Sequence, residues 1–223
     1  MSDIDMEQYL FIERGSPELF RGSKEADVLF LGQDPTIVSP RHIPVVLDLK
    51  NSSGQLSKYI FGKICKTLRF NRKRVLAWNL VNRYFIKKPR TLVDDPRVEP
   101  YLLDKFPQMN GNKNDWKTVR FLYHYFVEFG KQELEYVVNK YQPCILISLG
   151  EPVFRILRYA YALPQNIAMP ENLSEFYCDM TFKIKIGRII LAWLALPHQL
   201  TGDHNPHYQK VLSDKLPMIA NTL

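Results

Sequence analysis

Four short apolar runs constrain the fold of this chain more than any other feature of its sequence. They lie within residues 27–32, 75–79, 144–149 and 187–195. Runs of this length bounded by turn residues are typical of strands that are buried on both faces. Apolar residues at helical spacing predict helices between and after these strands, over 55–69, 115–141, 151–162 and 206–221. Strands that alternate with helices predict a parallel sheet that is covered on both faces.

The rest of the chain is predicted to be less regular. Pro, Gly, Asn and Ser residues predict loops over 37–54 and 86–114, and 163–176 is also expected to be irregular. We expect a short helix over 4–13 and an edge strand or hairpin arm over 182–186. The long helix 115–141 is expected to bend near Gly130.

The apolar runs and the cysteines exclude several classes of protein. The longest apolar runs, such as residues 189–196, are too short to cross a bilayer. The acidic residues 1–5 are not followed by the apolar segment of a secretory signal. Cys65, Cys144 and Cys178 are scattered and odd in number, which predicts free thiols in a reducing compartment. We therefore expect a cytoplasmic protein, or a nuclear one in a eukaryote, with no membrane partner.

The positive charge of the chain favours an anionic partner. The formal net charge is +7 and the pI is about 9.2, and neutralising phosphates releases counterions. Basic residues form two clusters, one on each side of the strand 75–79. They are Lys66, Arg69, Arg72, Lys73 and Arg74, and then Arg83, Lys87, Lys88 and Arg90. Charge alone leaves two interpretations open, a nucleic-acid-binding face or a solvated surface.

The parallel sheet predicts where a ligand would bind. Ligands of such sheets lie beyond the carboxyl ends of the strands. This rule places Asp34, Asn79, Gly150 and residues 197–200 around one crevice.

Four motifs in this crevice resemble those of the uracil-DNA glycosylase superfamily. Residues 32–35, Gly-Gln-Asp-Pro, match four of the five positions of the family 1 motif Gly-Gln-Asp-Pro-Tyr. Val-Leu-Ala-Trp-Asn at 75–79 resembles the family strand Val-Leu-Leu-Leu-Asn, and Leu149-Gly150 resembles its Trp-Gly turn. Ala-Leu-Pro-His-Gln-Leu-Thr at 195–201 resembles the loop Ala-His-Pro-Ser-Pro-Leu-Ser. The segment 52–56 is similar to the helix entry of family 4 enzymes, and order and spacing agree over residues 27–215.

The resemblance implies a fold and an activity. The fold would be a three-layer α/β/α sandwich with a central, mostly parallel four-stranded sheet, in a single domain over residues 1–223. The activity would be that of a monofunctional, monomeric DNA glycosylase, which flips a pyrimidine nucleotide and hydrolyses its N-glycosidic bond. Such an enzyme uses no cofactor and leaves an abasic site in DNA.

The resemblance also assigns the chemistry to particular residues. Cleavage builds positive charge on the sugar and negative charge on the leaving base. Asp34 would stabilise the sugar cation and orient the water, although Asp is also common before a proline in turns. The backbone amide of Gln33 would contact a base oxygen, and the Asn79 amide would read the Watson–Crick edge. A strand-end Asn bonding to backbone is the alternative for Asn79, and Asn82 is a less favoured reader.

Further residues would bind DNA. Leu200 matches the wedge leucine that fills the gap left by the flipped base, with Thr201 beside it, and an ordinary loop leucine is the alternative. Hydroxyls and backbone amides near two helix starts would contact phosphates. These belong to Ser52, Ser53, Gly54 and Gly150.

Three departures from the family pattern affect the predicted substrate. Thr36 replaces the tyrosine that blocks the C5 side of the pocket, and Leu47 aligns with the stacking phenylalanine. The catalytic histidine is displaced to His198, which would reach either the base oxygen or a phosphate. A metal site from His198, His204 and His207 is disfavoured because no recognisable zinc motif is complete. Three cysteines are also too few for the iron–sulfur cluster of family 4.

These departures leave two functional hypotheses. The opened C5 side predicts a substrate that is uracil or a 5-modified pyrimidine, such as the modified cytosines of phage DNA, in DNA repair or antiviral defence. The alternative is a catalytically inactive member of the superfamily that binds DNA or a protein. A hydrolase with a Gly-x-Ser-x-Gly elbow and a P-loop nucleotide-binding protein are disfavoured because the chain has neither motif.

Overall fold

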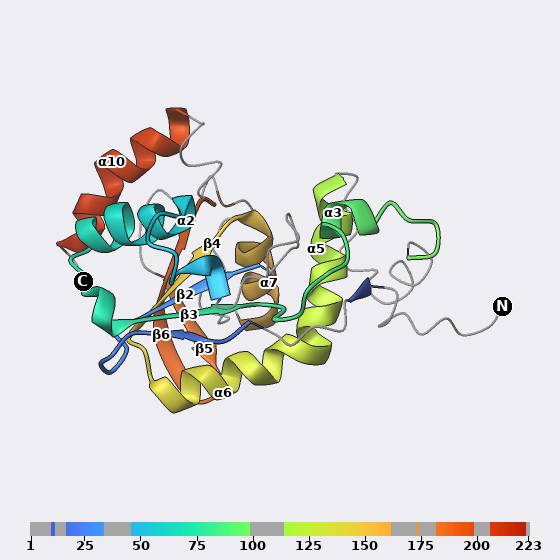
Figure 1. The fold of residues 1–223 in the computed structure, drawn as a ribbon, viewed down its shortest axis with the longest axis horizontal. Helices are drawn as coiled ribbons and strands as arrows, with labels where there is room; N and C mark the ends of the chain where they lie inside the picture. Colours follow the sequence, from blue (N-terminus) through green and yellow to red (C-terminus); the bar gives the residue numbers. More distant parts are fainter. Residues whose placement is uncertain are drawn as a thin grey trace.

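All four predicted apolar runs form strands of one sheet. The computed structural model describes residues 10–11, 17–33, 46–98, 114–161, 173, 182–198 and 206–221. The fold is mixed α/β, and its sheet has six strands in the order β1-β3-β2-β4-β6-β5 (Figure 1). The central strands are β3 (Val75–Asn79), β2 (Val28–Gly32), β4 (Ile145–Leu149) and β6 (Ile189–Leu196). They are parallel to one another, as predicted.

The number of strands was predicted wrongly, because the sheet has six strands instead of four. The two additional strands are antiparallel edges, β1 (Phe20–Arg21) beside β3 and β5 (Phe182–Ile186) beside β6. The prediction of an edge strand or hairpin arm at 182–186 is confirmed. Its turn contains Gly187 with a φ of 58°, in the left-handed region that favours glycine.

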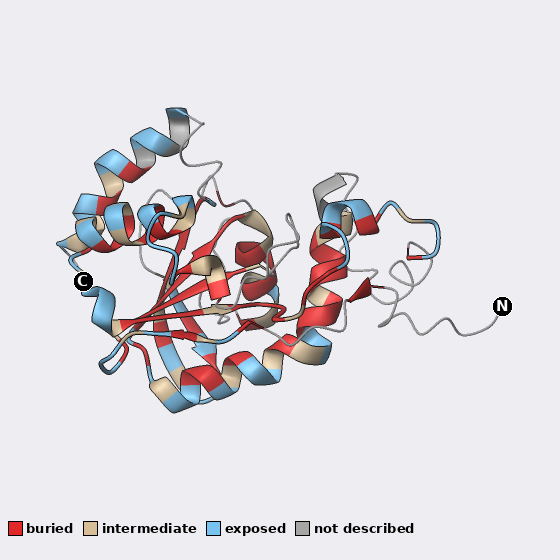
Figure 2. Ribbon diagram, viewed as in Figure 1, coloured by how far each residue is buried: buried red, intermediate tan, exposed pale blue. Residues whose placement is uncertain are grey.

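Each face of the sheet packs against its own hydrophobic core. Side chains alternate along β2, so that Leu29 and Leu31 enter one core while Val28 and Phe30 enter the other. The first core also contains residues of α5 (Asn114–Tyr125), α6 (Lys131–Tyr141) and α7 (Glu151–Tyr161). The second contains residues of η2 (Lys58–Cys65) and α10 (Pro206–Ala220). Figure 2 shows buried residues along the strands and along the inward sides of these helices.

The long helix predicted over 115–141 is present and bends as expected. It consists of α5, a π-helical stretch η5 (Phe126–Gly130) and α6. Figure 1 shows α5 and α6 running in clearly different directions. The bend fits the π-helical stretch, a known cause of kinks. The predicted helix 55–69 also contains a π segment, because α2 (Gln55–Ser57) continues directly into η2.

Short helical turns occupy parts of the predicted loops. They are η1 (Val46–Asp48) within 37–54 and α3 (Pro89–Leu92) within 86–114, while η3 (Arg72–Arg74) precedes β3. The predicted helix 4–13 and the irregular stretch 163–176 lie outside the described residues apart from positions 10–11 and 173. None of the helices that the structure describes is long and apolar enough to cross a membrane.

The two described cysteines are free and differ in environment. Cys65 is buried in η2, and its burial raises the pKa of the thiol to about 12. Cys144 is exposed and immediately precedes β4, so the strand begins one residue later than predicted.

Candidate active site

The strand ends place Asn79 and Gly150, two of the predicted site residues, along one edge of the sheet. Gly32 pairs with Asn79, and Leu149 pairs with Leu196, so the carboxyl ends of all four parallel strands are level. Neighbouring strands are about 4.8 Å apart, so Asn79 and Leu196 are separated by roughly 14 Å. Gly150 and His198 extend just beyond this edge.

Gly32, Leu47 and Asn79 come together at one end of this edge. A Cβ atom built on Gly32 would lie 2.4 Å from Leu47 Cδ2 and 2.8 Å from Asn79 Oδ1. The absence of a side chain at Gly32 therefore leaves room for both neighbours. Leu47 is partly buried and packs against the second core, so the predicted apolar platform is adjacent to the predicted base-reading amide.

The backbone of Leu47 is strained. Its φ is 58° and that of Asp48 is 50°, a region that L-residues other than Asn and Asp rarely occupy. Such strain costs on the order of 1–3 kcal/mol per residue and persists only where the surroundings impose it. Here the Val46 amide donates to the Glu18 carbonyl at 2.9 Å, and the Val46 and Leu49 side chains on either side are fully buried. The structure thus holds the Leu47 side chain against Gly32 despite this cost.

The Asn79 side chain is buried and has an unsatisfied acceptor. Asn79 is 1% exposed, and its Nδ2 donates to Asn82 Oδ1 at 3.4 Å. Its Oδ1 is buried and has no hydrogen-bond partner among the residues that the structure describes. A buried acceptor left unpaired costs roughly 1–3 kcal/mol. A ligand that brings a hydrogen-bond donor to this point would recover that cost.

Backbone hydrogen bonds fix the start of the Gly-Gln-Asp-Pro motif. The Leu80 amide donates to the Gly32 carbonyl at 2.9 Å, and the Val81 amide donates to the Gln33 carbonyl at 3.1 Å. Beyond β2 and β3 the two chain segments therefore remain paired. Asp34, Thr36, Leu200 and Thr201 lie outside the described residues, so the roles predicted for them stay predictions.

Gly150 and His198 are neighbours at the other end of the edge. A Cβ atom built on Gly150 would lie 3.5 Å from His198 Cβ, and Gly150 has a φ of 91°. The Gly150 amide donates to the Leu196 carbonyl at 2.8 Å, and its carbonyl accepts from the Phe154 amide at 3.1 Å at the start of α7. The Gly150 N–H predicted to bind phosphate is therefore used to join β4 to β6.

A hydrogen bond from the second-core face holds the backbone next to His198. Tyr59 of η2 donates its hydroxyl to the Pro197 carbonyl at 3.0 Å, in a buried contact. Sequence reasoning treated Tyr59 only as an apolar helix position. The apolar spacing of the helix does not predict this hydrogen bond to Pro197, because the two residues are 138 positions apart.

Burial within the surrounding protein lowers the pKa of His198 below its ordinary value of 6.5. The side chain keeps substantial exposed surface, but the surrounding protein displaces enough water to disfavour the charged ring. His198 is therefore neutral near pH 7. A neutral imidazole can still donate one hydrogen bond to a developing anion.

We expect the lowered pKa of His198 to make the free energy of unfolding depend on pH. Because the folded-state pKa lies below the unfolded one, the unfolded chain gains a proton first as the pH falls through 6.5. The contribution of His198 to the free energy of unfolding is therefore complete above pH 6.5 and decreases below it. Denaturant unfolding at about pH 7.5 and about pH 5.5 should show a larger loss in the wild type than in His198→Asn. Equal losses in both proteins would contradict the assignment.

The predicted phosphate contacts in the Ser52–Gly54 turn are largely engaged within the turn. Ser53 donates its hydroxyl to Asn51 Oδ1 at 2.8 Å, and the Gly54 amide donates to the Asn51 carbonyl at 3.1 Å. These two donors would have to leave Asn51 to contact a phosphate. Ser52 is exposed.

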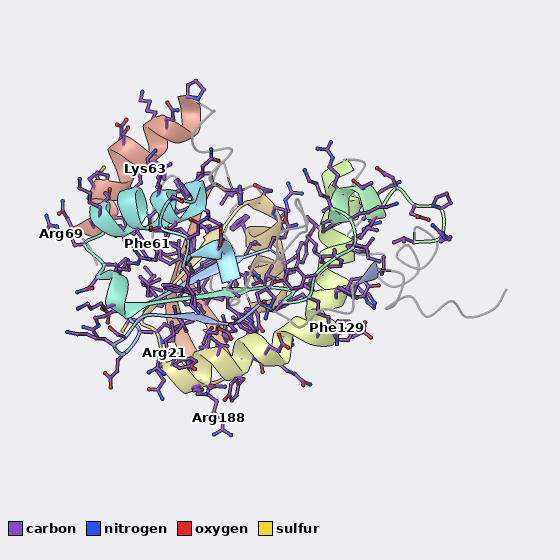
Figure 3. The ribbon with its side chains drawn as sticks, in the orientation of Figure 1. Arg21, Phe61, Lys63, Arg69, Phe129 and Arg188 are labelled. Atoms are coloured by element: carbon purple, nitrogen blue, oxygen red, sulfur yellow. The ribbon has the colours of Figure 1, made fainter. Side chains whose placement is uncertain are left out.

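The first basic cluster lies away from the candidate site. It surrounds η3, at the amino end of β3, whereas Asn79 is at the carboxyl end. Arg74 forms an ion pair with Asp27 at 2.6 Å, and Arg72 stacks over the Phe61 ring at 4.4 Å. Figure 3 shows Lys63, Arg69 and Phe61 together at this end of the molecule. Its position favours a solvated surface for this cluster.

The second basic cluster follows the carboxyl end of β3. Arg83 lies over the Phe129 ring at 3.9 Å and the Phe11 ring at 5.5 Å, so it packs the chain beyond β3 against η5. Lys87, Lys88 and Arg90 are exposed. These three cations remain candidates for DNA contact.

The metal site that the sequence disfavours is tested only in part, because most of its candidate side chains lie outside the described residues. The described residues contain no group of three or more His, Cys, Asp or Glu residues that could hold a metal ion. Of the three candidate histidines, only the side chain of His198 is described.

In comparisons with known proteins, no protein-family model and no curated protein matches this chain. The resemblance to the uracil-DNA glycosylase superfamily therefore depends on the motif residues and on where the fold places them.

Proposed function

We propose that this protein is a DNA glycosylase of the uracil-DNA glycosylase superfamily. The observation that carries the proposal is the buried Oδ1 of Asn79, which has no hydrogen-bond partner among the described residues and lies over Gly32 beside the apolar side chain of Leu47. An amide edge next to an apolar surface can bind a planar heterocycle that has polar edges and an apolar face. Two cores on opposite faces of the sheet support a three-layer α/β/α arrangement of the superfamily type.

In this proposal the remaining chemistry belongs to Asp34 and His198. Asp34 is two residues beyond the last residue of β2 in the sequence, and it would stabilise the sugar cation and orient the attacking water. His198 is neutral near pH 7 because its pKa is lowered, so it would donate a hydrogen bond to the departing base. Water attack at C1′ breaks the N-glycosidic bond and leaves an abasic site. The base leaves with the bonding electron pair and takes up a proton.

The substrate is proposed to be a pyrimidine with room for a 5-substituent. Thr36 in place of the family tyrosine supports this choice, as does an aliphatic Leu47 in place of an aromatic platform. If the enzyme releases uracil but no 5-substituted base, the proposed 5-modified substrate is wrong. Repair of uracil in DNA is then the function that remains.

The test is mass spectrometry of bases released from defined DNA that contains uracil, thymine or 5-modified cytosines. Asp34→Ala is expected to reduce release by at least about 10²-fold, since electrostatic stabilisation of a transition state is typically worth this much. DNA affinity should stay close to that of the wild type. Asp94→Ala, at an exposed carboxylate, is the matched control and should retain full activity.

Full activity of Asp34→Ala would remove Asp34 from the mechanism. The absence of any released base and of abasic sites in the wild type would reject the glycosylase. It would favour the alternative of a catalytically inactive member that binds DNA or a protein.

A further inference from the structure

We propose that Asn82 is a positioning residue that fixes which end of the Asn79 amide faces the bound base. It would thereby decide whether the site accepts the imide edge of a uracil-type base or the amino edge of a cytosine-type base. This inference rests on the proposed function and adds a determinant of specificity that does not itself contact the base.

The carbonyl of Pro17 fixes the orientation of the Asn82 side-chain amide. Asn82 is 3% exposed, and its Nδ2 donates to Pro17 O at 3.0 Å. A carbonyl oxygen can only accept, so the nitrogen end of the Asn82 amide must face Pro17. The oxygen end of Asn82 is then the end that faces Asn79.

The orientation of the Asn82 amide in turn fixes the orientation of the Asn79 amide. Asn82 Oδ1 can only accept, so it takes a hydrogen from Asn79 Nδ2, at a rather long 3.4 Å. The Asn79 Oδ1 therefore points away from Asn82 and toward Gly32, where it is buried and has no partner in the part of the chain that the structure describes. If the amide were reversed, two oxygens would face each other between Asn79 and Asn82. Three successive groups thus give the amide one favoured orientation.

A fixed orientation has a consequence for the ligand. Besides Oδ1, the Asn79 amide retains its second N–H, so it offers one acceptor beside one donor. Uracil and thymine present a ring N–H beside a carbonyl, whereas cytosine presents a ring nitrogen acceptor beside an amino group. In a given pose of the ring, these two edges are opposite in polarity. A fixed amide therefore accepts one class and places like groups against the other, and a free amide could turn to accept both.

Two substitutions of Asn82 separate this role from a structural one. Asn82→Leu removes the acceptor for Asn79 Nδ2 and the donor for Pro17. Asn82→Asp also loses the donor for Pro17 but keeps an oxygen acceptor for Asn79 Nδ2, in a side chain of nearly the same shape. The Asn79 orientation should therefore be lost in the first variant and kept in the second. If Asn82→Leu does not fold, Asn82→Ala serves in its place.

The first measurement does not depend on catalysis. The side-chain NH₂ resonances of Asn79 in a ¹⁵N–¹H spectrum should move and lose exchange protection in Asn82→Leu. They should stay close to the wild-type positions in Asn82→Asp. Unchanged Asn79 resonances in Asn82→Leu would show that Asn82 does not hold the amide.

The second measurement compares release of 5-hydroxymethyluracil and 5-hydroxymethylcytosine from otherwise identical DNA. The two bases carry the same 5-substituent and differ only in the edge that Asn79 would read. We expect the wild type to prefer one of them by about 10- to 100-fold, the discrimination typical of a bidentate amide contact. The preference should fall at least about tenfold in Asn82→Leu and stay within about threefold in Asn82→Asp.

The outcomes distinguish the two proposals. Release by the wild type with the same preference in all variants would overturn the role of Asn82 and leave the glycosylase intact. Equal loss of preference in Asn82→Leu and Asn82→Asp would also overturn it, because that is the result of a purely structural role. If the wild type releases neither these bases nor uracil, the proposed function fails and selection of the base by Asn82 fails with it. The spectra then still decide whether Asn82 holds the amide.

Discussion

Gly130→Ala is expected to lower the free energy of unfolding by about 1–3 kcal/mol, the usual cost of forcing an extra methyl group into a packed interior. A Cβ atom at this position would lie 1.8 Å from Leu80 O and 3.0 Å from Leu80 C. Both atoms belong to the backbone, so a side-chain rotation cannot relieve the clash. Either η5 or the chain that follows β3 must move. Thermal unfolding should show a drop of roughly 2–4 °C for each kcal/mol lost.

The clash would also reach the candidate site. Leu80 immediately follows Asn79, and its amide holds the Gly32 carbonyl at 2.9 Å. A shift of Leu80 away from Gly130 would disturb this hydrogen bond and the position of the Asn79 amide. Base release should therefore fall together with stability.

Gly62→Ala is the matched control for this substitution. Gly62 also lies in a π-helical segment, but a Cβ atom there meets nothing within 4 Å apart from the backbone of its own helical turns. Alanine should therefore stabilise this helix by about 0.5–1 kcal/mol, because it restricts the unfolded chain more than glycine does. If Gly130→Ala proved as stable as Gly62→Ala, the close packing of η5 against Leu80 would be incorrect.

In Gly32→Ala the rate of base release is expected to fall by about 10²-fold or more, while the protein remains folded. The new methyl group would meet Leu47 Cδ2 at 2.4 Å and Asn79 Oδ1 at 2.8 Å. Both atoms are ends of side chains, so they can move at a modest cost in stability. The displacement removes the proposed platform and turns the amide, and a misplacement of about 1 Å can cost 10²-fold in rate.

A double variant tests this explanation. Leu47→Ala removes the atom that the Gly32→Ala methyl group meets first. Gly32→Ala with Leu47→Ala should therefore restore part of any stability lost, but not the base release, because the contact with Asn79 Oδ1 remains. Normal release by Gly32→Ala would show that the substrate does not bind between Leu47 and Asn79.

The sequence predicts the central sheet well because local information determines it. The runs at 27–32, 75–79 and 144–149 are short, apolar and bounded by turn residues, and strands buried on both faces need no long-range information to be recognised. The rule that ligands bind beyond the carboxyl ends of parallel strands then predicts that Asn79 and Gly150 lie on the same edge.

The features that the sequence does not predict depend on contacts between distant segments. The strand β1 has only two residues, Phe20 and Arg21, and pairs with β3 without any apolar pattern of its own. The Asn82–Pro17 hydrogen bond joins positions 65 apart. The sequence therefore predicts for Asn82 only the role of a less favoured base reader, whereas the structure makes it a partner of Asn79. The left-handed backbone of Leu47 is imposed by its surroundings, since leucine itself disfavours this conformation.

The contrast between the two described cysteines allows Cys144 to be labelled selectively once Cys178, which lies outside the described residues, is replaced by serine. The thiolate is the nucleophile that attacks thiol-directed reagents, and Cys65 does not form it near neutral pH because its pKa is raised to about 12. Cys144 is exposed and precedes β4, at the sheet edge opposite Gly150. A fluorophore attached there would be held by the same strand that leads to the candidate site, yet it would lie a full strand length from the Asn79 amide. Such a probe could report DNA binding without blocking the site.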